Sequence, residues 1–380
     1  MRSVFIVSLG DGYGGAERSI EIIANRLQQD VRIIVFASSS KHVAALRSIL
    51  CPPSRLIVFR CGDGTMNWFS WVAMFLVFLT VFRPNAIITN TNLSAELLAA
   101  TARVMPEISR RAFIFVRDFA WRDLDRIFQR LDKARVLIPG PALLDRPDYI
   151  ARHLAPVGPM QWSIVGNAMN LPGHAPPPDE SDGYVLHLAS SNLWKGHYQL
   201  IRAAALLRDS GVPMRFISRG GVHNRELWLA FHRIISRWKL GGLFALWDAV
   251  DDPSELLHRS LCVVVPSISH FGGPETFGRA IIEAWAHRKP VVAFDVGGGH
   301  YLIEHEKDGL LVPEGNVAQL ADALRSLRQD PDLCRRLGEA GLAKGWMALY
   351  PTKLYNVGPS ETGGFPSAPL AFDSSPLPSS

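Results

Sequence analysis

Short apolar runs rich in β-branched residues alternate with longer helix-forming stretches along most of this chain, and that alternation limits the choice of folds most strongly. In the first half, the apolar runs lie at residues 4–8, 31–36, 56–59, 86–89, 113–116 and 135–138. Periodic segments such as residues 16–28 and 93–104 separate them. Continuous apolar runs joined through helices are typical of parallel strands in a sheet that helices cover on both faces.

The same rhythm starts again after a break at residues 170–183. The break holds four prolines, two glycines and three acidic residues, a composition typical of a linker. Beyond it, apolar runs lie at residues 184–188, 214–218, 243–246, 261–265, 290–294 and 309–312, and helix-forming segments at 199–208, 225–239, 254–259, 277–287 and 317–328. We therefore predict an α/β protein with two Rossmann-like, doubly wound domains that face a cleft. The expected divisions are a first domain (1–169), the linker (170–183), a second domain (184–345), and a partial crossover segment with a disordered tail (346–380).

The composition excludes several other classes of protein. Of the 380 residues, 48% are hydrophobic and 20% are charged, which argues against a disordered or fibrous chain. The four cysteines are too scattered for a disulfide framework or a zinc site. The first apolar run is too short for a signal peptide and ends in glycines, so it is expected to be a buried strand.

Positive charge is concentrated in the first part of the chain. Residues 1–170 hold 20 Lys and Arg against 13 Asp and Glu, a net charge of +7, and the remainder holds 20 against 22, a net charge of −2, which together give +5. Much of the excess lies between Arg110 and Arg135. Such a stretch suits an anionic acceptor or an anionic membrane, or is a solvated helix face. No nucleic-acid motif accompanies it, so nucleic acid is not an expected partner.

One segment is apolar almost throughout. Residues 68–82 contain only Ser70 and Thr80 as polar interruptions. A bilayer span needs about 20 apolar residues, so this segment is too short to be one. It is expected to be a helix buried against the sheet or, alternatively, a helix that dips into a membrane surface.

A glycine-rich loop, GDGYGG at residues 10–15, follows the first expected strand and opens a helix. It matches the G-x-G-x-x-G fingerprint of dinucleotide sites. Such sites also need an acidic residue at the end of the second strand, and residues 35–40 hold none. The glycines still let backbone N–H groups approach an anion, so Gly14, Gly15 and Glu17 are candidates for a loop that faces phosphate or acceptor. Glu17 could equally compensate the helix dipole.

Residues 266–284 carry the most informative motif. A buried strand runs into a loop of Gly and Pro, and the loop ends at an expected helix start. Glu275 lies directly before the N-terminus of that helix, and Glu283 lies two turns into it. A carboxylate in the loop can accept hydrogen bonds from sugar hydroxyls, one on the helix can hold a ribose diol, and the N–H groups of Phe277 and Gly278 can bind a phosphate. The plainer alternative is a helix-capping Glu followed by an exposed Glu.

This segment resembles the Glu-(seven residues)-Glu motif of the retaining, nucleotide-sugar-dependent glycosyltransferases with the GT-B fold, often called family four. Its sequence Pro-Glu-Thr-Phe-Gly-Arg-Ala is close to the sequence that this family usually has in the motif. The resemblance implies that Glu275 contacts the transferred sugar and Glu283 the nucleotide ribose. It covers about residues 1–345 and is strongest over 184–330. It further implies a donor site that includes Ser190, Thr276, Phe277, Gly278 and Gly298.

A second segment resembles the family's Gly-Arg-x-x-x-x-Lys-Gly motif, in which Arg and Lys neutralise the donor diphosphate. Lys195 and Gly196 match it, whereas Ser190 stands where the family has Arg. This departure removes one of the cations that a diphosphate leaving group needs. Arg219, after the next strand, is a candidate substitute, and Lys195 could alternatively be a surface lysine.

Two further groups of residues are candidates for a site. In many relatives a His after a first-domain strand contacts the sugar, and Arg117 and Asp118 occupy a similar place here, where they could also form a surface ion pair. Asp123 and Asp125 have the spacing of a metal-binding Asp-x-Asp, but they lie in a charged, helix-like run. The resemblance implies no required metal, and the histidines show no ligand spacing.

The sequence thus predicts a retaining glycosyltransferase that moves a hexose from a UDP- or GDP-sugar to a glycan or lipid-linked acceptor, in cell-surface polysaccharide synthesis. Glu275 and Lys195 are the expected catalytic residues, and no cofactor is expected. The expected location is the cytoplasm, at the inner face of the plasma membrane. Because Ser190 replaces Arg, an inactive relative that binds a glycan or nucleotide as a partner is the first alternative. A dinucleotide-dependent oxidoreductase is the second.

Overall fold

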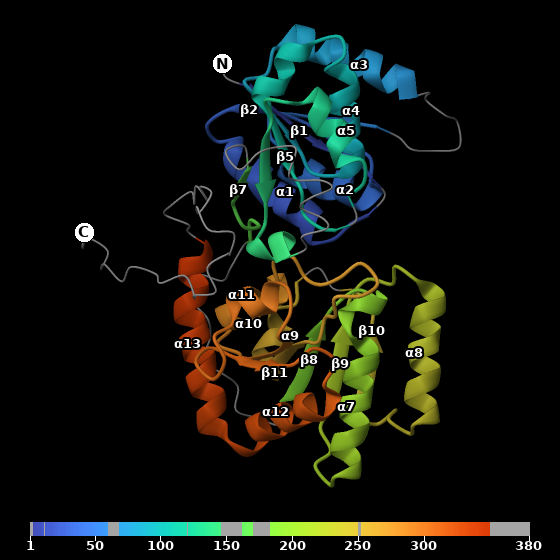
Figure 1. The fold of residues 1–380 in the computed structure, drawn as a ribbon, viewed down its shortest axis with the longest axis vertical. Helices are drawn as coiled ribbons and strands as arrows, with labels where there is room; N and C mark the ends of the chain where they lie inside the picture. The colour runs from blue at the N-terminus through green and yellow to red at the C-terminus, as the bar shows by residue number, and fades with distance from the viewer. Residues whose placement is uncertain are drawn as a thin grey trace, which may run out of the picture.

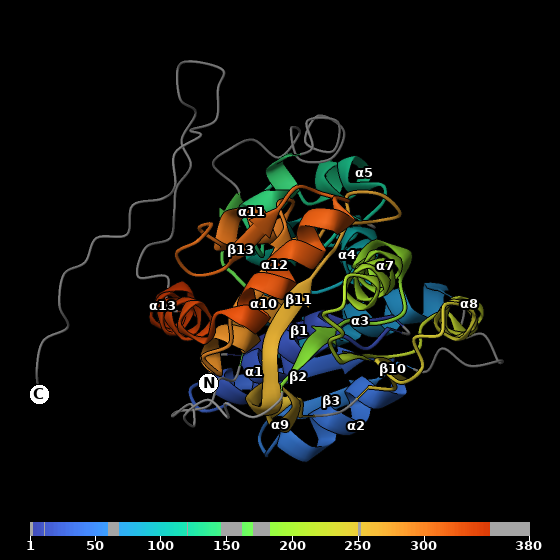
Figure 2. The same ribbon diagram turned by 90° about the horizontal axis from the view of Figure 1, so that it is seen from below.

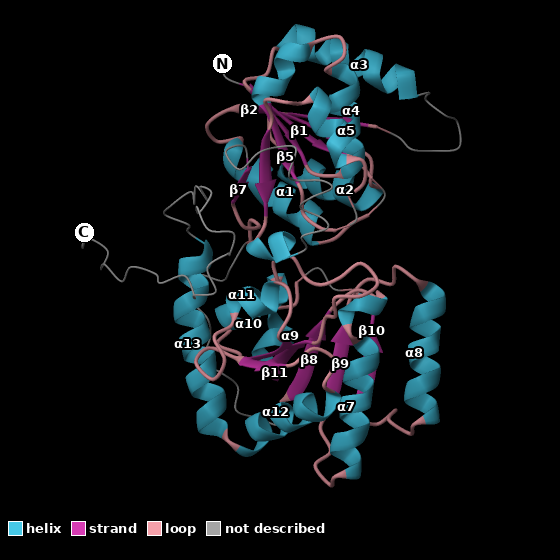
Figure 3. Cartoon of the chain, viewed as in Figure 1, coloured by secondary structure: helices cyan, strands magenta, loops and turns pink. Residues whose placement is uncertain are grey.

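The computed structural model describes seven stretches of the chain, namely residues 3–10, 12–59, 68–119, 121–145, 162–169, 183–249 and 252–349. They form two parallel sheets, each packed between helices, one in the first half of the chain and one in the second (Figures 1 and 3). The predicted α/β architecture with two doubly wound sheets is confirmed. Most of the expected linker lies outside the described residues, as do residues 350–380 of the expected tail.

The first sheet has seven strands in the order β3-β2-β1-β4-β5-β6-β7, and every pairing is parallel. Its order reverses direction between β1 and β4, which is the switch point where ligands bind in open α/β sheets. The strands are β1 (Ser3–Ser8), β2 (Arg32–Ala37), β3 (Arg55–Val58), β4 (Ala86–Thr89), β5 (Ala112–Phe115), β6 (Arg135–Ile138) and β7 (Trp162–Ile164).

The second sheet has six strands in the order β10-β9-β8-β11-β12-β13, again all parallel. Its switch point lies between β8 and β11, so both sheets follow the same winding rule. The strands are β8 (Tyr184–Leu188), β9 (Phe216–Arg219), β10 (Phe244–Trp247), β11 (Ser260–Val265), β12 (Val291–Phe294) and β13 (Leu310–Val312).

Helices connect the strands and cover both faces of each sheet (Figures 1 and 2). Those of the first half are α1 (Gly15–Leu27), α2 (Ser40–Ile49), α3 (Trp68–Phe82), α4 (Asn92–Thr101) and α5 (Leu124–Arg130). Those of the second half are α7 (His197–Asp209), α8 (Arg225–Arg237), α9 (Ser254–Arg259), α10 (Arg279–Ala286), α11 (Gly298–Leu302), α12 (Val317–Gln329) and α13 (Pro331–Leu349). Short 3₁₀ turns lie at η1 (Pro106–Arg111), η2 (Pro141–Asp145) and η6 (Leu193–Lys195).

An aromatic cluster joins α3 to the first sheet. Phe36 of β2 lies 5.2 Å from Phe5 of β1 and 5.0 Å from Phe75 of α3, measured between ring centroids. All three rings are fully buried. Burial of one such side chain contributes about 1.5–3 kcal/mol, so this cluster is a major reason why α3 lies on the sheet. The stretch at 68–82 therefore forms the expected helix with one face buried, and its other face is exposed.

One expectation needs correction. The helix expected at residues 277–287 begins at Arg279, because Gly278 adopts a left-handed backbone with φ of 84° that a helix cannot continue through. Near the end of the described chain, α13 packs against α10. There Gly341 lies so close to Trp285 that an added Cβ would be 2.1 Å from the indole ring.

Candidate functional site

The segments that meet between the two domains all follow the carboxyl ends of strands. Thr276, after β11, donates a hydrogen bond of 2.6 Å from its hydroxyl to the backbone oxygen of Arg117, after β5. Tyr301 of α11 donates one to Asp145 of η2, and desolvation of Tyr301 together with that contact raises the pKa of the phenol. Two expected site residues, Thr276 and Arg117, therefore meet at one seam, at the edges where open sheets bind ligands.

Lys195 and Glu275 form an ion pair at this seam. The Nζ atom of Lys195 contacts Oε1 of Glu275, and the two side chains are 16% and 21% exposed. The ammonium group also lies 3.9 Å from the centroid of the Trp194 ring, a cation–π contact. The two residues that sequence reasoning selected as catalytic, 80 positions apart, thus share one place.

Glycines allow the loops around this pair to approach one another. Gly196 has φ of 76°, and an added Cβ there would be 1.8 Å from the backbone oxygen of Pro266. Gly298 donates a backbone hydrogen bond of 2.6 Å to the oxygen of Glu275, and a Cβ on Gly298 would be 2.7 Å from the carbonyl of Phe277. Any side chain at these positions would displace the loop that carries Glu275.

Two buried histidines support Lys195 from behind. His187 of β8 lies with Nε2 3.0 Å from the backbone oxygen of Lys195 and with Nδ1 3.0 Å from the hydroxyl of Ser218. Its ring contacts His197, which stacks on Phe231 at 4.9 Å. Burial and the neighbouring cations lower the pKa of His187 well below its usual value, and burial and Lys195 lower that of His197 to about 4. The pair is therefore neutral at physiological pH.

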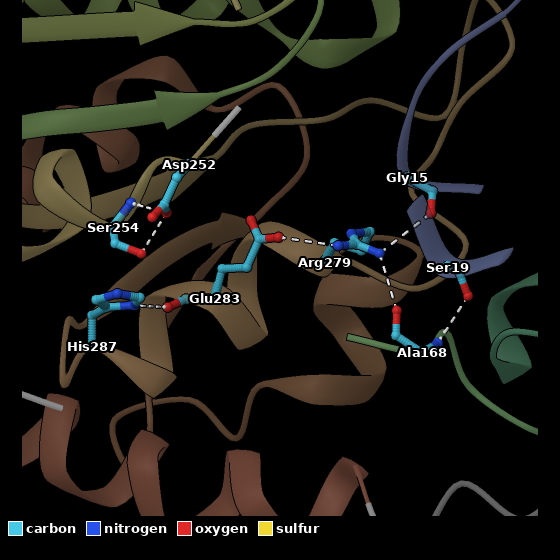
Figure 4. A network of polar contacts seen from close by, with 8 residues as sticks. All are labelled: Gly15, Ser19, Ala168, Asp252, Ser254, Arg279, Glu283 and His287. Carbon is cyan, nitrogen blue, oxygen red and sulfur yellow. Dashed lines mark hydrogen bonds and ion pairs between the residues drawn. The ribbon is translucent and has the colours of Figure 1, made fainter. Parts of the chain in front are cut away.

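Glu283 is held by Arg279, which also crosses to the first domain (Figure 4). Nη2 of Arg279 lies 3.4 Å from Oε1 of Glu283, and its Nη1 donates to the backbone oxygens of Gly15 at 3.3 Å and Ala168 at 3.2 Å. Burial raises the pKa of Glu283, and the nearby guanidinium groups partly offset that rise. Arg279 therefore couples the expected ribose-binding carboxylate to the glycine-rich loop.

That loop is shaped by its own side chains. Oε2 of Glu17 accepts a hydrogen bond of 2.8 Å from the backbone N–H of Gly14, so this carboxylate caps α1. The hydroxyl of Ser38, directly after β2, bonds both the N–H and the oxygen of Gly10. A serine thus lies where a dinucleotide fold would place its ribose-binding acid.

Ser190 and Arg219 occupy neighbouring strand ends. The Ser190 hydroxyl accepts a hydrogen bond of 2.9 Å from Asn192. Arg219 ends β9 next to β8, but its guanidinium lies 5.5 Å from the ring of Trp247 on β10, on the other side of β9. Arg219 leans away from the strand that precedes Ser190, and Ser190 itself carries no charge.

Arg117 and Asp118 differ from each other in their surroundings. The Arg117 side chain is only 5% exposed, is hydrogen-bonded to the amide oxygens of Asn90 and Asn167, and lies 3.6 Å from the Phe115 ring. Burial lowers the pKa of this guanidinium to about 9. Asp118 is exposed. Of these two residues, Arg117 is therefore a buried cation and Asp118 lies at the surface.

Comparison with known proteins bears directly on the second half of the chain. The family described as glycosyl transferases group 1 matches residues 174–344. These residues belong to that family. The match includes Lys195, Glu275 and Glu283 together with the glycine loops that bring them close, and for these residues membership of the glycosyl transferases group 1 family, predicted from those motifs, is confirmed.

Curated relatives are similar over part of the chain. The putative glycosyltransferase EpsD of Bacillus subtilis is 27% identical over 162 residues, which is 43% of this chain and 40% of EpsD. The alpha-D-kanosaminyltransferase of Streptomyces kanamyceticus is 40% identical over 163 residues, 41% of this chain and 39% of the relative. The matched region thus spans about two fifths of these relatives' length.

Solved structures are similar over nearly the whole chain. HepE of Anabaena, in complex with UDP and glucose, has a TM-score of 0.76 at 20% identity and covers 92% of this chain and 95% of its own. Sucrose-phosphate synthase from Thermosynechococcus elongatus has a TM-score of 0.72 at 19% identity, with coverage of 92% and 95%. At this identity the likeness establishes the two-domain GT-B fold.

Arg279 is the site residue that sequence reasoning missed. Its pairing with Glu283 was accessible, because the two lie four positions apart on a helix. Its contacts with Gly15 and Ala168 could not be predicted, because they join residues 264 and 111 positions apart.

Within the described residues, no cluster of three or more His, Cys, Asp or Glu could hold a metal ion. None of the helices described is long and apolar enough to cross a membrane.

Proposed function

We propose that this protein is a retaining glycosyltransferase that moves a hexose from a nucleoside diphosphate sugar to a glycan or lipid-linked acceptor. The observation that carries the proposal is the Lys195–Glu275 pair, held at the seam by glycine loops inside a group 1 family match. The UDP and glucose bound by HepE, which shares this fold, favour UDP over GDP as the base. The role in cell-surface polysaccharide synthesis is supported by similarity to EpsD and to a lipopolysaccharide core glycosyltransferase of Rhizobium meliloti.

The described residues suggest how the donor is bound. Lys195 and the backbone N–H groups of Phe277 and Gly278, just before α10, would neutralise the diphosphate. Glu283 would hold the ribose diol after exchanging its contact with Arg279 for the ligand. Thr276 and Gly298 would border the sugar. Because Ser190 leaves a cation missing, we infer that Arg279, which contacts Glu283 on α10, supplies positive charge in its place.

The reaction we propose needs no covalent glycosyl-enzyme. The bond between the anomeric carbon and the departing phosphate oxygen breaks, and the acceptor oxygen bonds to the same carbon on the same face. The acceptor's proton passes to the departing phosphate oxygen. Glu275 orients the sugar, and Lys195 stabilises the charge that develops on the phosphate. Gly14, Gly15, Arg117 and Asp118 would line the acceptor side of the closed cleft, from which water is excluded.

Product analysis tests this proposal. Purified protein is incubated with UDP- or GDP-hexoses and a panel of glycan and lipid-linked acceptors, and the new glycosidic bond is examined by NMR. We expect release of the nucleoside diphosphate and an anomeric configuration equal to that of the donor. Inverted configuration would refute the retaining mechanism. Donor binding without any turnover, even with the best acceptor, would favour the inactive, ligand-binding relative that Ser190 suggests.

We also propose that the acceptor is met at an anionic membrane surface on the cytoplasmic side. The first domain's excess of positive charge supports this, since Arg110, Arg111, Arg122, Arg126 and Lys133 are all exposed. Anionic lipids attract such residues by about 1 kcal/mol each near the surface. Binding to phosphatidylglycerol vesicles at low salt is the expected outcome, and a protein that remains wholly unbound would contradict it.

A further inference from the structure

A pocket of about 330 Å³ opens in the first domain, where the end of α3 meets η1. Its floor is apolar, formed by the buried residues Leu79, Ile87 and Ile108. Its rim carries the exposed cations Arg83 and Arg111 together with a single acid, Glu107. An apolar floor under a cationic rim suits a group that has both a hydrocarbon part and an anionic oxygen.

The surface around this pocket is unusually apolar. Val77 and Val81 of α3 are 59% and 66% exposed, and Phe69, on the same helix face, is 75% exposed. Val104, which is next to the pocket residue Met105 in the chain, is 67% exposed. No residue of α3 is charged. A helix with one face buried in the protein and the other apolar and exposed is suited to lie in a membrane interface.

This surface lies apart from the candidate active site. Figure 1 shows α3 at the end of the first domain farthest from the second domain. The pocket is built from the end of α3, the start of β4 and η1, that is, from the amino end of the strand. The residues that face the second domain follow the carboxyl ends of strands. Occupation of the pocket therefore leaves the Lys195–Glu275 pair accessible.

We propose that this pocket binds the phosphate-bearing headgroup of an anionic phospholipid while the exposed face of α3 enters the bilayer interface. The inference rests on the membrane partner proposed above and adds to it a defined site. Arg83 and Arg111 pair with the headgroup phosphate, and Phe69, Val77 and Val81 contact the acyl region. The remaining basic residues contribute longer-range attraction that salt screens within about 10 Å at 0.1 M.

Vesicle flotation of the full chain tests the proposal. The probes are phosphatidylcholine vesicles with and without phosphatidylglycerol. We expect about tenfold tighter binding to the vesicles that contain phosphatidylglycerol. The double variant Arg83→Gly, Arg111→Gln should lose most of that preference. Arg83 has φ of 43°, a conformation that glycine adopts without strain, so Arg83→Gly alone should not lower thermal stability.

A matched control separates a defined site from general attraction. Arg122→Gln with Arg126→Gln removes the same charge from the exposed basic stretch outside the pocket. If this control weakens binding as much as the pocket variant does, or if wild type shows no preference for phosphatidylglycerol, the proposal is overturned. Val81→Ser should weaken binding to both kinds of vesicle. Turnover of a soluble acceptor does not involve the pocket, so all these variants should retain that turnover. If the wild type itself shows no turnover, the proposed activity is refuted and the lipid site is not.

Discussion

At the scale of single residues, the site is built around an ion pair whose two side chains are largely buried. Lys195 and Glu275 pair with each other, so neither leaves an unpaired charge at the seam. A donor diphosphate would compete with Glu275 for the ammonium group and release the carboxylate toward the sugar. The same ion pair that stabilises the loop thus prepares both groups for binding.

Substitution of Glu275 tests this account at that scale. Glu275→Gln keeps the shape of the side chain but removes the charge that pairs with Lys195. We expect kcat to fall by roughly a hundredfold, with a much smaller change in the donor's KM, because the contact matters most in the transition state. Steady-state kinetics with a nucleotide sugar measure both. Substitution of the exposed Glu339 by Gln serves as a control that should leave both constants unchanged. If Glu275→Gln raises KM and leaves kcat unchanged, Glu275 only binds the donor.

At the scale of elements, the strands and most helices could be predicted because their signals are local. The runs at residues 86–89, 135–138 and 184–188 and the helix at 254–259 have the bounds that the structure shows. The start of α10 could not be predicted, because the left-handed backbone of Gly278 depends on the packing of the loop. α13 could not be predicted in the same way, because its glycines lower helix propensity, whereas in the fold Gly341 leaves room for the Trp285 ring. In the same way, the motifs identified Glu275 and Lys195, but only the tertiary fold shows that they touch.

The buried histidines behind Lys195 make a prediction about β8 and α7. The pKa of His197 is about 4 in the folded protein, so the unfolded chain binds more protons once pH falls below about 6.5. The free energy of unfolding is therefore highest above that pH and declines toward pH 4. At pH 5 the decline due to His197 alone is about 2 kcal/mol. His197→Phe should reduce this decline in urea unfolding measured at pH 8 and pH 5. The exposed His232→Phe should not, and equal declines in all three proteins would contradict the explanation.

At the scale of the whole molecule, specific side-chain contacts join the two domains. Arg279 binds backbone oxygens of Gly15 and Ala168 while it holds Glu283, so α10 and the glycine-rich loop of the first domain are linked through one side chain. The family match, at residues 174–344, lies in the second half of the chain. We expect acceptor choice to depend on the first domain, which carries the basic stretch and the exposed apolar face of α3.

The most direct test of the central claim is thermal unfolding of the wild type and of Glu283→Ala with UDP-, GDP-, ADP- and dTDP-sugars and with NAD(P)H. A ligand that binds only the folded protein raises the melting temperature according to its affinity and concentration. The account predicts a shift with one nucleotide sugar, most directly a UDP-sugar, that the variant loses. A shift with NAD(P)H alone, or a nucleotide-sugar shift that Glu283→Ala leaves intact, would contradict it.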